Sequence, residues 1–179
     1  SDSATTSEQA FLPADKPTGD WKVLRPREEG HEYSADHRDG KFYIRTNTDK
    51  GTNFKVMTCP VDKTDAAEWK DLLPYKPKIL VSNISVFKDF AVIGESEGGK
   101  TELRVLDFAT GKNPRLIFTE PVYDVAMAEN PDFAASKFRY LYTSLVRPDS
   151  TFEYDPASGK SRLLKERAVL GGYDASKYQ

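Results

Sequence analysis

Apolar and polar residues alternate along short segments of this chain, a pattern that predicts β-strands with one buried face. The alternation is clear in Thr101–Leu106 and again in Thr151–Tyr154. Clusters of turn-forming residues separate such segments. The segments with strand character are Lys41–Arg45, Asn53–Met57, Lys78–Val81, Phe90–Ile93, Thr101–Leu106, Arg115–Phe118, Phe138–Tyr142, Thr151–Tyr154 and Ser161–Leu164.

The spacing of these strands indicates an internal repeat. Phe42, Phe90 and Phe138 stand 48 residues apart, and the turn Asp107–Lys112 recurs 48 residues later as Asp155–Lys160. Each turn begins with an Asp that can hydrogen-bond its own backbone and contains a Gly that is free to take a positive φ. A period of about 40–50 residues with four short strands per unit is typical of β-propeller blades.

The pattern therefore predicts an all-β fold, a partial β-propeller of about three four-stranded antiparallel blades. The blades are expected at 31–84, 85–120 and 121–166 within a propeller segment 21–170, after an N-terminal segment 1–20. Trp21–Arg27 is expected to be the outer strand of a preceding blade. Ala66–Leu73 is expected to be a short helix that stops at Pro74. The structural alternative is a single open β-sandwich with evenly spaced strands.

Seven stretches of the chain, in order, resemble one known family. They are His31–Arg38, Phe42–Asn47, Glu120–Tyr123, Arg139–Leu145, Phe152–Asp155, Leu163–Lys165 and Val169–Asp174. These stretches resemble the propeller of the oligopeptidase B group within the prolyl oligopeptidase family of serine peptidases. The resemblance spans about residues 11–179, nearly the whole chain.

The resemblance implies a seven-bladed propeller that caps an α/β-hydrolase domain and a parent enzyme that cleaves peptides after Arg or Lys. Seven blades need roughly 340 residues, so this chain is expected to supply the last three. Residues 171–179 are then expected to be a loosely held linker toward the hydrolase domain, which carries the catalytic Ser, Asp and His of the family. The implied partners are that domain, the remaining blades and the peptide substrates of the parent.

Composition and charge narrow the possible functions. Lys and Arg number 26 against 28 Asp and Glu, a net charge of -2, so no basic excess favours nucleic acid or an anionic membrane. Apolar runs are too short for a membrane-spanning helix. Ser1–Gln9 is polar and resembles no signal peptide, so we expect a cytoplasmic location, with a periplasmic one left open. Cys59 is the only cysteine, which excludes an intrachain disulfide, and it is expected to be a small packed or loop residue rather than a reactive thiol.

One motif imitates a catalytic site. Gly94–Gly98 fits the G-x-S-x-G pattern of the hydrolase nucleophile elbow, with Ser96 at its centre. The elbow requires a strand, a sharp turn and a helix, whereas here strands are predicted on both sides. The hydrolase order also requires a His after the Ser, and no His follows His37. We therefore predict a β-hairpin at Ser96 and no nucleophile.

Other candidate groups are predicted to be structural. Asp36 and His37 are neighbours on a strand and point to opposite faces, so they cannot readily form a base and its orienting carboxylate. His31 and His37 are too far apart along a regular strand to share a metal ion. Carboxylates that neighbour each other near turns are expected to be solvated. They are Glu28/Glu29, Asp62/Asp65 and Glu95/Glu97.

The sequence thus predicts a non-catalytic propeller piece with no catalytic, cofactor-binding or metal-binding residue. Its role would be to select peptides by size above the active site of a parent peptidase. The alternative function is a stand-alone β-repeat module that binds a protein or a peptide.

Overall fold

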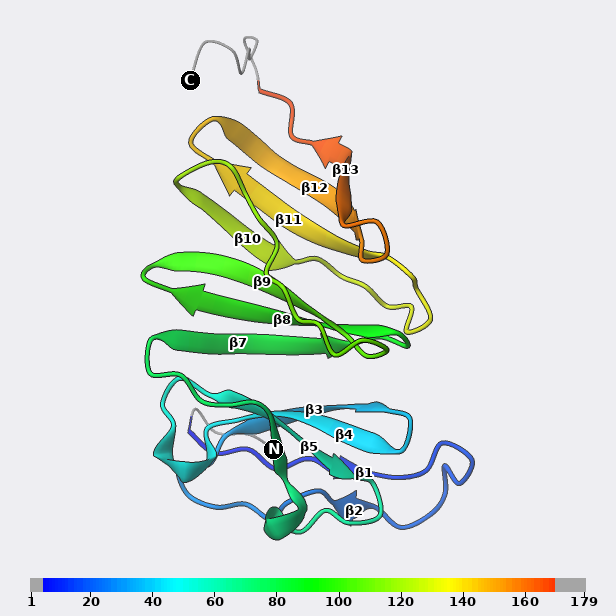
Figure 1. Cartoon of the computed structure of the whole chain (residues 1–179). Coiled ribbons are helices and arrows are strands. Elements are labelled where there is room, and N and C mark those ends of the chain that lie inside the picture. The colour runs from blue at the N-terminus through cyan, green and yellow to red at the C-terminus, as the bar shows by residue number, and fades with distance from the viewer. Residues whose placement is uncertain (1–4, 170–179) are drawn as a thin grey trace. The chain divides into compact units, whose positions relative to one another are not determined.

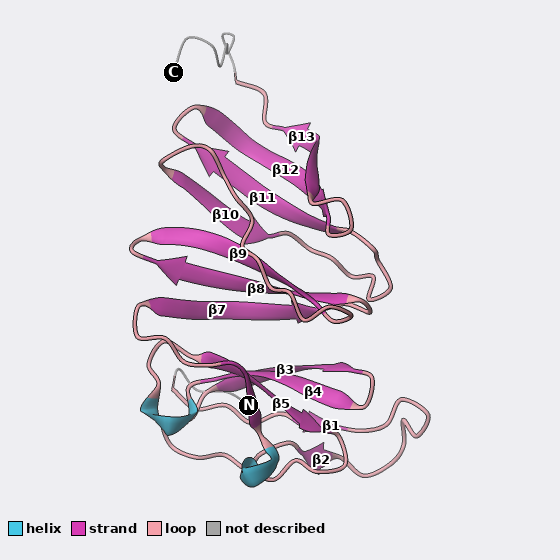
Figure 2. Cartoon of the chain, viewed as in Figure 1, coloured by secondary structure: helices cyan, strands magenta, loops and turns pink. Residues whose placement is uncertain are grey.

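A computed structural model describes residues 5–169, and nearly all of their regular structure is β-strand, which confirms the predicted all-β fold (Figures 1 and 2). The predicted linker at 171–179 lies outside the described residues. The helical elements described are two 3₁₀ turns, η1 at Thr48–Lys50 and η2 at Ala66–Glu68. The strands are β1 Ala10–Phe11, β2 Lys22–Val23, β3 Tyr33–Arg38, β4 Lys41–Thr46, β5 Lys55–Pro60, β6 Lys70–Leu73, β7 Ile79–Val86, β8 Phe90–Glu97, β9 Lys100–Asp107, β10 Tyr123–Met127, β11 Phe138–Ser144, β12 Arg147–Asp155 and β13 Lys160–Glu166.

The strands form four antiparallel sheets, in the orders β1-β2, β3-β4-β5-β6, β7-β8-β9 and β10-β11-β12-β13. The chain separates into two compact units, 1–84 and 85–179, and β7 spans the division between them. No helix among the described residues is long and apolar enough to cross a membrane.

The predicted repeat of the phenylalanines is confirmed. Phe42, Phe90 and Phe138 lie on β4, β8 and β11, each the second strand of its sheet, and they are 7%, 3% and 0% exposed. Equivalent burial at a constant spacing shows that the three sheets use one structural pattern.

The two predicted turns are also alike. The backbone N–H of Gly111 donates to the carbonyl of Asp107, and that of Gly159 donates to the carbonyl of Asp155, at 2.8 Å in both. The two glycines have φ of 70° and 67°, in the left-handed region that glycine occupies at little cost. In each turn an oxygen of the Asp side chain also accepts a backbone N–H, from Thr110 at 2.7 Å and from Ala157 at 3.0 Å.

The helix predicted at Ala66–Leu73 is wrong. A single 3₁₀ turn ends at Glu68, and Lys70–Leu73 forms β6, which pairs antiparallel with β5. Trp69 between them is 5% exposed, with extended φ and ψ of -73° and 118°, and its indole N–H donates to the carbonyl of Thr64 at 3.0 Å. Burial of this ring and pairing with β5 outweigh the helical propensity of the segment.

The strand predicted at Arg115–Phe118 is also wrong, because only an isolated bridge between Arg104 and Arg115 forms there. Pro114 lacks an N–H for a ladder, and Ile117 is 93% exposed. The middle sheet therefore has three strands rather than four. The outer strand expected at Trp21–Arg27 is limited to β2, which pairs with β1.

The core of the first unit lies on one face of the sheet β3–β6. Register places Phe42 between His37 and Cys59, and Ile44 between Ala35 and Met57. Segments before the sheet help to cover this face with Leu24 and Phe11, and Trp69 packs into it. The buried members of the cluster are Leu24, Tyr33, Phe42, Ile44, Met57, Cys59 and Trp69.

The core of the second unit joins β8 and β9 to the sheet β10–β13. Thr101 ties the two sheets, because its hydroxyl donates to Asp124 at 2.7 Å and accepts the backbone N–H of Val125 at 2.8 Å. The buried members of this cluster are Phe87, Phe90, Val92, Leu103, Val105, Leu116, Val125, Phe138, Tyr140 and Tyr142.

Three blades in an open arc would leave the strand residues of the two end sheets partly exposed to water, but most of these residues are covered. Of eight such residues, six are buried, and Phe152 and Tyr154 are half-buried against the second core. In the first unit Phe11 and Leu24 help to cover Phe42 and Ile44, and in the second unit Phe118 and Tyr123 pack against Tyr142. The six buried residues are Tyr33, Phe42, Ile44, Val56, Tyr140 and Tyr142.

The start of the chain protects the edge strand of the first unit. The backbone N–H groups of Tyr33 and Ala35, on β3, donate to the side-chain oxygens of Ser7 and Gln9 at 2.6 and 2.8 Å. The carbonyl of Tyr33 accepts the Ser7 hydroxyl at 3.0 Å. Side chains thus replace a fifth strand and satisfy donors that would otherwise invite pairing with another chain.

Candidate functional site

Ser96 lies in a hairpin, as the sequence predicted. It pairs with Thr101 across β8 and β9, and Gly98 and Gly99 make the turn with φ of 59° and 81°. A strand therefore follows the turn, where a nucleophile elbow has a helix.

His31 and His37 occupy unlike environments. His37 is exposed on β3, with its ring edge-on to Phe42. His31 is buried, its Nε2 is 2.8 Å from the hydroxyl of Thr46, and its Nδ1 has no partner in the structure as described. Burial lowers the pKa of His31, with a further lowering from the charge of Arg25. Groups of three or more metal-binding side chains are not found among residues 5–169.

The prediction that Glu95 and Glu97 are solvated loop residues is wrong for Glu95. Its side chain is 4% exposed, and its two carboxylate oxygens accept from Arg104 at 2.7 Å and Arg115 at 2.6 Å. Arg115 also reaches Glu97 at 2.7 Å, and Arg104 donates to the carbonyl of Asn113 at 2.7 Å. We call Glu95, Glu97, Arg104 and Arg115 the charge network.

The charge network replaces the missing fourth strand of the middle sheet. Burial alone would raise the pKa of Glu95, but hydrogen bonds and charge from Arg104 and Arg115 outweigh it and hold this pKa below its ordinary value. Arg115 belongs to the segment that follows β9 and bonds to Glu95 and Glu97 on β8, while Arg104 on β9 bonds to Asn113 in that segment, so the network fastens the segment to the hairpin. Arg104 lies diagonally across the two strands from Glu95, because it pairs directly with Ile93, two residues before Glu95. This diagonal placement is the signal that the sequence carries for the network.

Cys59 is a packed residue, as predicted. It is 1% exposed within the core of the first unit. Burial raises the pKa of its thiol to about 11, so at neutral pH little of it is the reactive thiolate.

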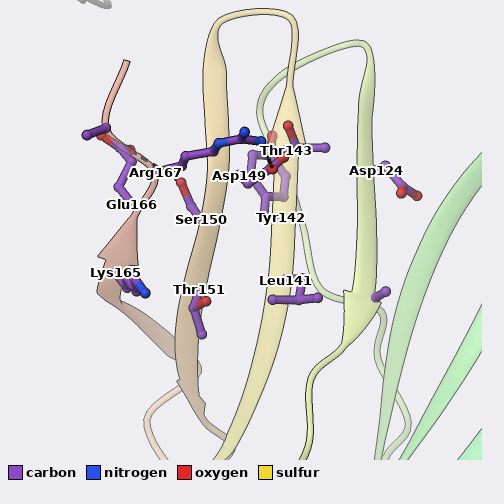
Figure 3. A pocket seen from close by; sticks show the side chains of 12 residues that line it. Asp124, Leu141, Tyr142, Thr143, Asp149, Ser150, Thr151, Lys165, Glu166 and Arg167 are labelled. Atoms are coloured by element: carbon purple, nitrogen blue, oxygen red, sulfur yellow. Dashed lines mark hydrogen bonds and ion pairs between the residues drawn. The ribbon is translucent and has the colours of Figure 1, made fainter. Parts of the chain in front are cut away.

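A hollow with a volume of about 740 Å³ lies on one face of the sheet β10–β13 (Figure 3). Register places Leu141 between Ala126 and Thr151, and Lys165 beyond Thr151, in one row across four strands. Leu141 is 48% exposed although it stands at the centre of the sheet. Its neighbours on the strand, Tyr140 and Tyr142, point to the opposite, buried face. We call the face with Leu141 the open face.

Charged residues gather at one end of the open face. Figure 3 shows Asp149, Arg167 and Thr143 together there, away from Leu141 and Thr151. Arg167 is paired with Asp149 at 3.2 Å, and both side chains are well exposed. β13 is exposed along its whole length. An uncharged centre with an ion pair at its rim is the composition of a protein-contact surface rather than of a reaction centre.

Repeated antiparallel sheets of three or four strands, with an equivalent buried phenylalanine on the second strand of each, define a propeller segment. The chain matches the family model described as "Prolyl oligopeptidase, N-terminal beta-propeller domain" over residues 1–167. The chain therefore belongs to this family, and the resemblance seen in the sequence is confirmed.

Comparisons with individual relatives support the same family assignment. Over 177 residues the chain is 38% identical to dipeptidyl aminopeptidase BI from Pseudoxanthomonas mexicana, covering 99% of this chain and 24% of the relative. Over 179 residues it is 26% identical to Protease 2 from Moraxella lacunata, covering 100% and 25%. The fold matches oligopeptidase B from Trypanosoma brucei with a TM-score of 0.88 and 26% identity, covering 98% and 26%. The chain thus spans about a quarter of the length of these relatives.

Proposed function

We propose that this chain is the non-catalytic propeller part of a peptidase that cleaves short peptides after Arg or Lys. Together with the remaining blades it limits by size the peptides that reach an α/β-hydrolase domain. The open face is the observation that carries this proposal. It leaves Leu141 half exposed at the centre of a sheet whose opposite face buries Tyr140 and Tyr142 in the second core.

The open face is suited to contact with a further blade. A sheet face in a propeller normally packs against its neighbour, and Ala126, Leu141 and Thr151 form a continuous row across three strands for such contact. Relatives four times as long have ample chain to supply the neighbouring blade and the hydrolase domain. The rival function, a stand-alone binding module, would require this face to stay in water.

The catalytic part of the proposal is tested with the chain alone. We expect no hydrolysis of Arg- or Lys-containing peptides, because Ser96 lies in a hairpin and no His follows His37. A serine-directed covalent probe should leave Ser96 unlabelled. Labelling that disappears in Ser96→Ala would overturn this expectation.

Reading the encoding gene beyond Gln179 separates the two functions, since a hydrolase domain supports the proposal and a stop codon supports the rival.

The gating part is tested in the parent peptidase. Leu141→Arg places a charge in the open face and should loosen the contact with the next blade. Cleavage of a long unfolded polypeptide should then rise relative to a five-residue peptide with one Arg. Leu145→Arg is the matched control, since Leu145 is 83% exposed and lies between β11 and β12. Equal size selection in both variants would refute gating through this face.

A further inference from the structure

The side chain of Arg45, on β4, is held by contacts on two sides. Its Nε–H donates to the backbone carbonyl of Val81, on β7, at 2.7 Å. Its guanidinium carbon lies 3.4 Å from the centroid of the Phe54 ring, in a close cation–π contact. Val81 is itself fastened to the loop between β4 and β5, because its N–H donates to the carbonyl of Asn53 at 2.9 Å. The orientation of the guanidinium is therefore set before any ligand binds.

Phe54 has a backbone conformation that is unfavourable for its residue type. Its φ is 59°, in the left-handed region, where a Cβ atom crowds the following carbonyl oxygen. The residue is nevertheless buried, and its N–H donates to the carbonyl of Gly51 at 2.9 Å. This strained residue supplies the ring that lies against Arg45. The fold thus accepts a backbone cost at the position that orients the guanidinium.

The two Nη atoms of Arg45 have no protein partner. Neither forms a hydrogen bond or an ion pair with another of the residues 5–169, and neither is fully buried. Ser34 pairs with Arg45 across β3 and β4, so the two side chains lie on the same face of the sheet. The hydroxyl of Ser34 likewise has no hydrogen bond to any residue in the described part of the chain. Two guanidinium nitrogens and a hydroxyl are therefore available together.

Arg45 also lies where negative charge is scarce. Burial lowers the pKa of its guanidinium, and the charge of Glu32 offsets this effect only in part. Arg115 shows the opposite balance, because hydrogen bonds and charge from Glu95 and Glu97 outweigh its burial and raise its pKa. A guanidinium stays charged at neutral pH. Arg45 is thus a half-buried cation whose neighbours do not compensate its charge.

We propose that Arg45 binds a carboxylate of a peptide. Each carboxylate oxygen would accept a hydrogen bond from one Nη atom, in the bidentate arrangement that suits a planar guanidinium, and the hydroxyl of Ser34 would donate a further bond. The carboxylate is that of a peptide C-terminus or of an Asp or Glu side chain, which offer the same pair of oxygens. This inference rests on the first unit alone and does not depend on size selection or on cleavage after Arg or Lys.

The test compares small ligands on the unaltered chain, at an ionic strength kept constant with sodium chloride. N-acetylglycine carries a terminal carboxylate, N-acetyl-aspartate amide carries a side-chain carboxylate, and N-acetylglycinamide is the neutral counterpart of the first. Titration followed by NMR should give saturable shifts at the backbone amides of Ser34, Arg45 and Phe54 with a carboxylate ligand. N-acetylglycinamide should bind at least about fivefold more weakly than N-acetylglycine. The carboxylate ligand that binds more tightly identifies the source.

Three variants locate the site. Arg45→Lys keeps the charge and removes the paired donors, so affinity for N-acetylglycine should fall about fivefold or more. Glu32→Gln removes the negative charge that acts on Arg45, so affinity should rise about twofold, which a purely structural role of Arg45 would not produce. Arg139→Lys makes the first change at an exposed arginine of the second unit and should have no effect. If Arg45→Lys fails to fold by circular dichroism, Glu32→Gln carries the test.

Four results would overturn the proposal. Equal affinity for N-acetylglycine and N-acetylglycinamide would mean that the carboxylate is not recognised. Shifts that sodium chloride alone reproduces would mean that the guanidinium attracts any anion. Unchanged affinity in folded Arg45→Lys would mean that the paired donors are not used. No saturable shift with either carboxylate up to about 50 mM would mean that Arg45 only fastens the loop to β7.

Discussion

The first and the last four-stranded sheets of this chain follow one pattern but differ in how their faces are covered. In the sheet β3–β6, Leu24 and Phe11 from preceding segments pack over the face that carries Phe42. In the sheet β10–β13 the aromatic face is packed, while the face with Leu141 is open and β13 is exposed throughout.

The types of side chain on each face differ according to whether other segments cover that face. The covered face of the first sheet is made of Tyr, Phe, Ile, Met and Cys side chains, which gain most from leaving water. The open face of the last sheet combines Ala, Leu, Thr and Lys side chains, which can stay exposed to water while no other surface covers them. The middle sheet is a third case, in which buried charges as well as the buried Leu116 fasten the flanking segment.

The largest effect should come from the packed faces. Phe42→Ala and Phe138→Ala should each lower the free energy of unfolding by about 3–5 kcal/mol, because each ring is buried and leaves a cavity. Leu141→Ala, on the open face next to the same core, should cost less than about 1 kcal/mol. Urea denaturation followed by circular dichroism measures all three. Similar costs for Phe138 and Leu141 would mean that the open face is packed after all.

The charge network should be nearly as important as an apolar core residue. Glu95→Gln should lower the free energy of unfolding by about 3 kcal/mol, since it leaves two arginines facing a neutral group. Glu97→Gln, at a carboxylate that is 41% exposed, is the matched control and should cost less than about 1 kcal/mol. Because the pKa of Glu95 is lowered on folding, its contribution is present above the ordinary carboxyl pKa and is lost as pH falls below about 4.5. If Glu95→Gln lost stability with falling pH in the same way as the unaltered chain, this account would be contradicted.

His31 should make the first unit sensitive to mild acid. Its pKa is lowered by burial, so between neutral pH and about pH 5 the imidazole binds a proton in the unfolded chain but not in the folded chain. Stability should therefore fall as pH falls through about 6.5, by at most about 1.4 kcal/mol per pH unit. His31→Gln should flatten this slope in thermal melts, and His37→Gln, at an exposed position, should keep it. Since these are the only two histidines, a slope that survives in both variants would exclude His31 as its source.

The smallest effect concerns self-association. We predict that the isolated chain associates through its open face, because Leu141 is exposed at the centre of its sheet. Leu141→Lys should weaken association by about 1 kcal/mol, measured by sedimentation velocity over a range of concentrations. Val23→Lys on β2, where the side chain is 43% exposed, should change nothing. A chain that stays monomeric throughout would show that the open face does not attract a second copy.

Much of the fold could be read from the sequence because it depends on local and periodic signals. The spacing of Phe42, Phe90 and Phe138 gave the repeat, and the turns at Gly111 and Gly159 need only a side chain that bonds its own backbone and a residue free to take a positive φ. The hairpin around Ser96 followed from strand signals on both sides. The absence of catalytic residues and the loosely held linker remain predictions.

The tertiary structure decided the features that depend on partners distant in the chain. Trp69 became extended because a core and an unpaired β5 were available to it, and no local pattern carries that information. Glu95 looked like a solvated loop residue until two arginines, 9 and 20 positions further on, met it in a buried site. Likewise Phe118 and Glu120, which lie in a loop, meet the ring and the hydroxyl of Tyr142 on β11. Periodicity records which face of a strand is buried, whereas the identity of the group that buries it is set only when the chain packs.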